Sequence, residues 1–251
     1  MATSRTEQRG GVEPLLQAWE ECREASPGER GLILLRIAAP ALSAADCAAL
    51  SVGRRDALLL DLFRRLFGDT APALVTCPGC RDELEFDVPL SGIAVTPPAD
   101  LPDHYTLRCE GHEIAYRLPC AGDLAALGAE ARAEVLDAAA QSLVQRCVLA
   151  IPSDLAWGDE LAGALEAAIA ARVAEHDPQA AVTLHFDCPA CGEHWGAPFD
   201  IVEFLWRRLD VFANALLRDV HVLASSYGWS EGQILALNPR RRRHYIEMIE
   251  A

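Results

Sequence analysis

The fold is decided by two similar stretches of sequence, residues 74–88, LVTCPGCRDELEFDV, and residues 182–199, VTLHFDCPACGEHWGAPF. In each stretch apolar and polar side chains alternate next to a Cys-Pro-x-Cys turn, as Leu84, Phe86 and Val88 do in the first. Alternation with a period of two is typical of a half-buried strand. Each stretch is therefore predicted to form a β-hairpin whose turn carries two cysteines.

The two cysteine turns predict a shared metal site. A CxxC turn brings two thiolates together, and two such turns supply the four sulfur ligands that structural zinc prefers. We therefore expect Cys77, Cys80, Cys188 and Cys191 to bind one structural zinc ion. Residues 81–187 lie between the turns, an interval far longer than in a compact zinc ribbon. The ribbon would therefore be split by an insertion.

Three alternatives compete with the shared zinc site. A redox CxxC pair lies where a helix N-terminus stabilises a thiolate, whereas strands are expected after both turns here. The turns could also be metal-free, or each could belong to a separate site. Separate sites would be completed by other thiols or imidazoles, namely Cys109, Cys120, His104 or His112 for the first turn and His185 or His194 for the second.

The remaining sequence is mainly helical, apart from a third hairpin expected over residues 105–118. Helical patterns cover residues 13–24, 29–38, 51–67, 123–149, 159–175 and 201–227, with short helices after Ser43, Ser230 and Asn238. The predicted fold class is α+β, with helical N- and C-terminal regions around a split zinc-ribbon-like set of β-hairpins. The predicted divisions are 1–70 (helical), 71–120 (β-hairpins with the first cysteine turn), 121–180 (helical insertion), 181–199 (β-hairpin with the second turn) and 200–251 (helical).

Composition indicates a globular protein of a reducing compartment. The chain has 251 residues, 51% hydrophobic and 24% charged, with a net charge of −15. Its apolar runs are shorter than the roughly 20 residues of a membrane helix, and its N-terminus lacks the apolar core of a signal peptide. We therefore expect no membrane association, a cytoplasmic location and no disulfides.

Neither catalysis nor nucleic-acid binding is favoured. The sequence contains no HExxH motif, Gly-rich phosphate loop or GxSxG turn, so no enzymatic activity is predicted. Arg240, Arg241, Arg242 and Arg243 form a basic run, but the strongly acidic chain opposes binding to a polyanion. A zinc-ribbon nucleic-acid reader remains the alternative function. The cluster Gly53-Arg54-Arg55-Asp56 is interpreted as a solvated helix surface, with an anion site as its alternative.

Several motifs together resemble a known family. They are the Gly53-Arg54-Arg55-Asp56 cluster, the paired Cys-Pro-x-Cys turns, Pro198-Phe199-Asp200-Ile201, and Tyr227-Gly228-Trp229 followed by Ile234-Leu235-Ala236-Leu237 and the Arg-rich helix. The succession resembles the T4-like baseplate hub assembly proteins of phage-tail-like contractile injection systems. The resemblance implies a role in building, or belonging to, the baseplate hub, without catalytic residues. One departure is Arg81, which stands where glycine is usual and where the second turn has Gly192.

The C-terminal segment, residues 227–251, is expected to contact a baseplate or hub protein. This expectation rests on the resemblance and on residue types that are common at interface hot spots. The candidate partner-binding residues are Tyr227, Trp229, Arg240, Arg241, Arg242, Arg243 and Tyr245. The alternative is that the aromatic residues pack against the long preceding helix and that the arginines pair locally.

Overall fold

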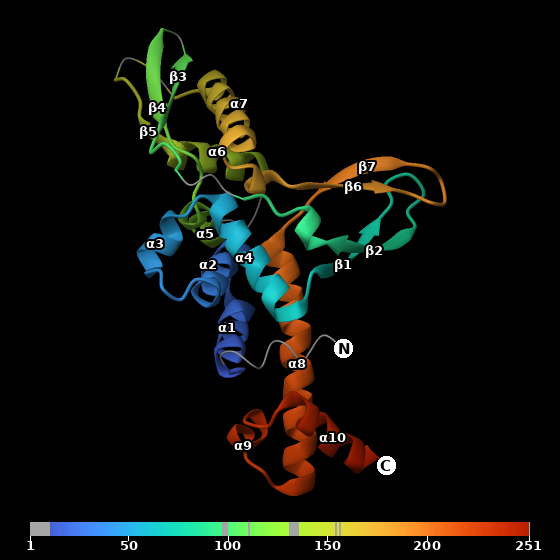
Figure 1. Cartoon of the computed structure of the whole chain (residues 1–251). Coiled ribbons are helices and arrows are strands. Elements are labelled where there is room, and N and C mark those ends of the chain that lie inside the picture. Colours follow the sequence, from blue (N-terminus) through green and yellow to red (C-terminus); the bar gives the residue numbers. More distant parts are fainter. Residues whose placement is uncertain are drawn as a thin grey trace.

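The structure is a computed structural model, in which three small antiparallel sheets lie among helices (Figure 1). It describes residues 11–96, 100–109, 111–130, 136–153, 155 and 157–250, apart from the side chains at 129–130, 136–140, 159 and 250. Helices form both terminal regions, and hairpins carrying the cysteine turns lie between them in the chain. The predicted α+β class is therefore confirmed.

Three of the four N-terminal helices begin at side-chain caps, whereas the first begins after Val12 without one. The helices are α1 (Glu13–Glu24), α2 (Pro27–Ala38), α3 (Ala44–Ala49) and α4 (Val52–Phe67). Ser26 and Ser43 form capping boxes at α2 and α3, and the Ser51 hydroxyl accepts a hydrogen bond from the third residue of α4. These caps satisfy amide groups that have no partner within the helix, which fixes where each helix starts.

The two cysteine turns close separate two-stranded sheets. Strands β1 (Thr70–Thr76) and β2 (Glu83–Pro89) form the first, and β6 (Thr183–Asp187) and β7 (His194–Pro198) form the second. Both pairs are antiparallel, and a short 3-10 helix η2 (Leu90–Gly92) follows β2. Figure 1 shows the hairpins side by side, projecting to one side of the helices.

Residues 105–181 contain β3 (Tyr105–Cys109), β4 (His112–Tyr116), α5 (Ala121–Glu130), α6 (Leu136–Cys147), β5 (Val148–Ala150), α7 (Asp159–His176) and η3 (Pro178–Ala181). The three strands form a second lobe with α6 and α7, whereas α5 packs against α2 and α3 (Figure 1). The helical pattern expected over 123–149 ends earlier than expected, because α6 ends at Cys147 and the following β5 pairs with β4. Arg117 ends this helix, since its backbone amide donates to the Cys147 carbonyl and its guanidinium donates to the Arg146 carbonyl.

Two hydrophobic cores hold the chain together. The larger one joins α1, α2, α4 and the first part of α8 (Ile201–Tyr227), and it also buries Ala71, Ala73 and Val88 from the first hairpin. The smaller one joins β3 and β4 with α6 and α7, and it includes the fully buried Leu165 and Cys147. Helices α4 and α5 and the short helix η3 connect the two cores.

The last helices extend away from the main core (Figure 1). Helix α8 is about 40 Å long at 1.5 Å per residue, and α9 (Glu231–Leu235) and α10 (Pro239–Glu250) pack against its second half. Asp200 caps α8 by accepting from the Val202 and Glu203 amides, while Glu203 binds Arg207 instead of completing a capping box. Phe199, just before the helix, packs against Phe204 in its first turn, with ring centroids 4.8 Å apart. This contact has the spacing of a hydrophobic staple.

Candidate metal centre

The two cysteine turns have the same hydrogen-bond pattern. In the first, the Cys77 amide donates to the Asp82 carbonyl at 2.9 Å, and the Arg81 amide donates to the Cys77 carbonyl at 3.0 Å. In the second, the Cys188 amide donates to the Glu193 carbonyl at 2.9 Å, and the Gly192 amide donates to the Cys188 carbonyl at 2.9 Å. The turns are therefore two copies of one local structure.

The residue after the second cysteine adopts a left-handed conformation in both turns. Gly192 has φ of 77°, and Arg81 has φ of 70°. Arg81 is the one non-glycine residue with positive φ among those the structure describes. Arg81, which stands where glycine is usual, thus leaves the turn unchanged. It does place a side chain in a conformation that favours glycine.

The four cysteine sulfurs lie within 4.8 Å of one another. The Sγ atoms of Cys77 and Cys191 are 3.7 Å apart, and those of Cys80 and Cys188 are 3.6 Å apart. A tetrahedral zinc ion with Zn–S bonds of about 2.3 Å requires S···S distances of about 3.8 Å. These two separations fit that geometry, and both are far longer than the S–S bond of a disulfide.

Packing between the hairpins brings the sulfurs together. The Phe86 ring on β2 lies 5.0 Å from the Phe186 ring on β6, and Phe186 lies 5.5 Å from Trp195 on β7. At the turns themselves, a Cβ atom at Gly79 would lie 3.3 Å from the Glu193 side chain and 3.4 Å from the Cys191 sulfur. The absence of a side chain at Gly79 therefore permits the close approach.

The pKa shifts differ among the thiols of the centre: that of Cys188 is lowered, whereas those of Cys80 and Cys191 are raised in part by hydrogen bonds among the sulfurs. Backbone amides, first that of Cys191, lower the pKa of Cys188 to about 7. Burial raises the pKa of Cys22 to about 11 and that of Cys147 to about 12. Cys188 is thus predisposed to the thiolate form that binds metals, while Cys22 and Cys147 act as small core residues.

The geometry decides between most of the alternatives left by the sequence. Within the described residues, Cys77, Cys80, Cys188 and Cys191 are the one group of three or more potential ligands close enough to hold a metal ion. This arrangement favours a shared site over separate sites completed by the other candidates. Strands β2 and β7 follow the two turns, so neither pair precedes the helix N-terminus typical of a redox CxxC.

The structure places the C-terminal candidate residues in two settings. Tyr227, Trp229 and Tyr245 contact one another, with ring centroids 4.8 to 5.7 Å apart. Arg242 is only 5% exposed, and its Nε donates to Asp219 at 3.1 Å. The remaining arginines of the run, Arg240, Arg241 and Arg243, are exposed. Arg242 is therefore buried and ion-paired with α8, while the side chains of the other three are accessible to solvent.

The cluster Gly53-Arg54-Arg55-Asp56 is not a solvated surface, contrary to expectation. Arg55 and Asp56 are 6% and 8% exposed and form an ion pair at 2.7 Å. The Gly53 amide donates to Asp177 at 2.7 Å, across 124 positions of sequence. Charge at a helix start suggested exposure, and nothing in the sequence pointed to Asp177 as the partner. Burial of this cluster is the main site feature that sequence reasoning missed.

The fold and the cysteine centre define a mixed α+β protein with two small antiparallel hairpins whose four cysteines lie close enough to hold a metal ion. Residues 15–206 match the family described as T4 bacteriophage base plate protein. The chain therefore belongs to this family, which supports a baseplate-associated structural or assembly role and contact with other baseplate proteins. Searches of curated proteins and of solved structures found no match. Across the described residues, no helix combines the length and the apolar character needed to cross a membrane.

Proposed function

We propose that the protein is a non-enzymatic assembly factor or structural subunit of the baseplate hub in a phage-tail-like contractile injection system. The family match over residues 15–206 is the observation that carries this proposal. The role fits assembly in the cytoplasm before or during incorporation into a particle. In this proposal residues 121–180 are an insertion between the two halves of a zinc-stabilised unit.

The assembly role is tested by deleting the chain from cells that produce the particle. We expect loss of complete baseplates, and complementation with the wild-type chain should restore them. Affinity purification from assembled particles and from free precursors then distinguishes a resident subunit from a transient factor. Normal particle yield without the chain would contradict the proposal.

We further propose that Cys77, Cys80, Cys188 and Cys191 hold one structural zinc ion. The support is the convergence of four thiols at separations that suit a tetrahedral ion. A bound ion would stabilise the fold by cross-linking hairpins that are far apart in sequence. Native mass spectrometry and metal analysis of protein purified without chelator should find one zinc ion per chain. If the double variant Cys188→Ser with Cys191→Ser keeps stoichiometric zinc, the shared site is wrong.

The competing functions make different biochemical predictions. A thiol oxidoreductase would reduce disulfides, and Cys77→Ala would abolish that turnover. A zinc-ribbon nucleic-acid reader would bind DNA or RNA tightly near physiological salt, with affinity falling as salt rises. We expect neither activity, because strands follow both turns and the chain carries a net charge of −15.

The C-terminal segment, residues 227–251, is proposed to dock onto a baseplate or hub component. The support is an aromatic cluster of Tyr227, Trp229 and Tyr245 on the same helical extension as the exposed Arg240, Arg241 and Arg243. Guanidinium groups near a helix start oppose the helix dipole, so carboxylates from another chain would stabilise them. Removing the exposed arginines should therefore weaken docking without unfolding the protein.

A further inference from the structure

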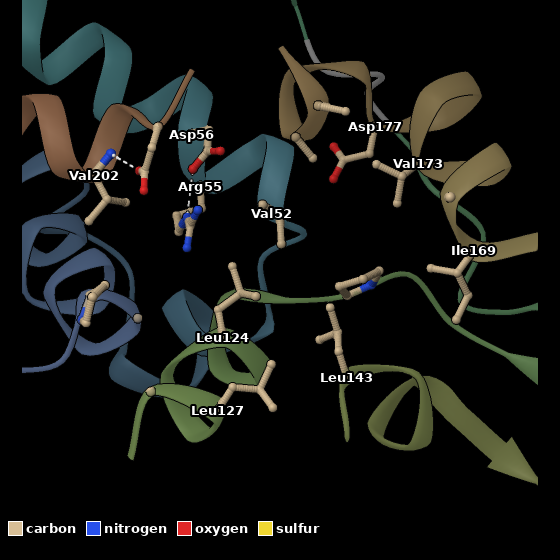
Figure 2. Close-up of a pocket in the computed structure, with 18 of the residues that line it drawn as sticks. Val52, Arg55, Asp56, Leu124, Leu127, Leu143, Ile169, Val173, Asp177 and Val202 are labelled. Atoms are coloured by element: carbon tan, nitrogen blue, oxygen red, sulfur yellow. Dashed lines mark hydrogen bonds and ion pairs between the residues drawn. The ribbon is translucent and has the colours of Figure 1, made fainter. Parts of the chain in front are cut away.

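A groove of about 810 Å³ lies between the two hydrophobic cores. Its volume is within the range of roughly 300–1,000 Å³ that is typical of ligand-binding pockets. The walls come from α2, α4, α5, α6, α7, η3 and the start of α8. Figure 2 shows Val52 of α4 and Leu124 of α5 near its centre, with Leu143 of α6 and Ile169 of α7 to the right.

The walls of the groove are mainly aliphatic and are not fully covered by the chain. Val52, Leu124, Leu127, Leu143 and Val173 line it, and each is half-buried. In a closed core such side chains would be buried completely, because apolar surface that stays in water gains no hydrophobic stabilisation. An apolar occupant would therefore gain free energy by covering them.

A buried carboxylate gives the groove a polar anchor. Asp177 lines the groove and is 1% exposed, and Figure 2 shows its carboxylate oxygens directed toward α4. Its Oδ2 accepts from the Gly53 amide, but among the described residues no hydrogen bond reaches its Oδ1. Burial raises the pKa of Asp177, although the Gly53 amide, the Ser51 hydroxyl and the cations of Arg54 and Arg55 lower it in part.

The remaining charges of the groove are mostly negative. Asp200 and Glu166 also line it, while the guanidinium of Arg55 is paired with Asp56. A buried or half-buried carboxylate is stabilised by a cation that can also donate hydrogen bonds. The groove is thus complementary to an apolar group that carries a positive charge.

We propose that this groove binds a continuous segment of a partner baseplate protein that inserts aliphatic side chains together with one arginine or lysine. The cationic side chain pairs with Asp177 and the aliphatic ones cover Val52, Leu124 and Leu143. The overall charge of the chain also favours a cationic partner. The seven arginines of residues 200–251 balance seven acidic residues there, so the net charge of −15 lies in residues 1–199. The source of the segment rests on the proposed function, whereas the chemistry of the groove does not.

The test uses the full-length protein and fluorescently labelled, overlapping peptides from the other proteins of the baseplate. We expect the peptides that bind to contain an arginine or lysine flanked by aliphatic residues. Replacing that cation by glutamine should weaken binding by about tenfold or more, as for other desolvated charge pairs. The variant Asp177→Asn should weaken binding similarly and should no longer distinguish the cationic from the glutamine peptide.

Two further variants separate binding in the groove from a general charge effect. Ala170→Trp places a large side chain at an exposed position lining the groove and should abolish binding. Asp61→Asn removes one charge from an exposed position on α4 outside the groove and should change nothing. Circular dichroism and zinc content confirm that each variant is folded.

The proposal is overturned if no peptide binds, or if binding survives both Ala170→Trp and Asp177→Asn. Equal binding of the glutamine peptide to the wild-type protein would overturn the pairing with Asp177. Failure of the assembly role would be seen in a different experiment. Particles would then form in cells that lack this chain, whether or not the peptides bind. The two proposals can therefore fail independently.

Discussion

Arg81 occupies a backbone conformation that favours glycine, and this predicts a stabilising substitution. Its φ of 70° matches the 77° of Gly192 at the equivalent place in the second turn. A left-handed conformation costs about 1 kcal/mol or more for a residue with a Cβ atom. Because the Arg81 side chain is exposed, Arg81→Gly should raise the free energy of unfolding by about 1 kcal/mol. Urea denaturation measures this change.

The second turn supplies the matched control. Gly192→Ala introduces a Cβ atom at φ of 77° and should lower the free energy of unfolding by about 1 kcal/mol. Zinc content should stay the same in both variants, since neither residue is a ligand. If Arg81→Gly were less stable than the wild type, the contacts of the arginine side chain would stabilise the fold by more than its backbone strain destabilises it.

Gly53 is required by the close contact between α4 and η3. A Cβ atom there would lie 2.2 Å from Asp177 Oδ1 and 3.0 Å from the Ala180 amide nitrogen. Gly53→Ala should therefore destabilise the protein by roughly 1–3 kcal/mol, the usual range for overpacking. Gly163 in α7 is the control, because a Cβ atom there would meet nothing within 4 Å and alanine should stabilise by about 0.5–1 kcal/mol. Equal effects of the two substitutions in thermal denaturation would contradict this contact.

At the scale of single residues, the sequence predicted sites that depend on local spacing and missed those that depend on distant contacts. The four cysteines were found because a CxxC turn fixes two ligands locally and matching turns suggest a pair. Arg55 and Asp56 were misread, because their burial comes from packing against other helices. The partner of Gly53 is 124 positions away, and no local pattern indicates such a contact.

Among the helices, α10 combines one internal arginine with three exposed ones. We predict that replacing Arg240, Arg241 and Arg243 with serine leaves folding and zinc content intact. The exposed side chains contribute little to stability, whereas loss of their charge should reduce co-purification with hub proteins and the yield of particles. Wild-type co-purification and particle yield from this variant would make the docking assignment wrong.

Arg242 provides the contrasting variant for this helix. It is 5% exposed and donates to Asp219 of α8, so Arg242→Ser removes a contact that holds α10 in place. We expect a loss of about 1.5–3 kcal/mol, as for other hydrogen bonds to charged groups. Thermal denaturation of the two variants thus separates arginines that stabilise the extension from those proposed to bind a partner.

Helix and strand boundaries were predictable where caps and alternation set them. The predicted end of α8 near Tyr227 agrees with the left-handed Gly228 that follows it, and the capping box of Ser230 and Gln233 is present at α9. The boundary between α6 and β5 was missed, because Arg117 captures the last carbonyls of the helix from outside the segment. Local propensity cannot anticipate a helix end that a tertiary contact creates.

For the whole molecule, the metal centre is the proposed cross-link between segments 74–88 and 182–199. A two-stranded hairpin is marginally stable alone, and each of these hairpins buries its inner face largely against the other and against the main core. Without an ion, the facing thiols offer only weak hydrogen bonds, and deprotonated thiols repel one another. Binding of the ion then no longer opposes unfolding of the long chain between the turns.

Removal of the metal should therefore lower the stability of the whole protein and expose the hairpins first. After treatment with EDTA under reducing conditions, we expect a lower melting temperature and faster proteolysis at the cysteine turns. Most helical circular dichroism should persist at about 25 °C, because the main core joins α1, α2, α4 and α8 without the cysteine centre. Added zinc should restore the melting temperature, and Cys109→Ala, which alters a cysteine outside the centre, should respond like the wild type. If metal-free protein, verified by metal analysis, melts at the same temperature and resists protease equally, contacts such as that of Phe86 with Phe186 hold the hairpins without an ion.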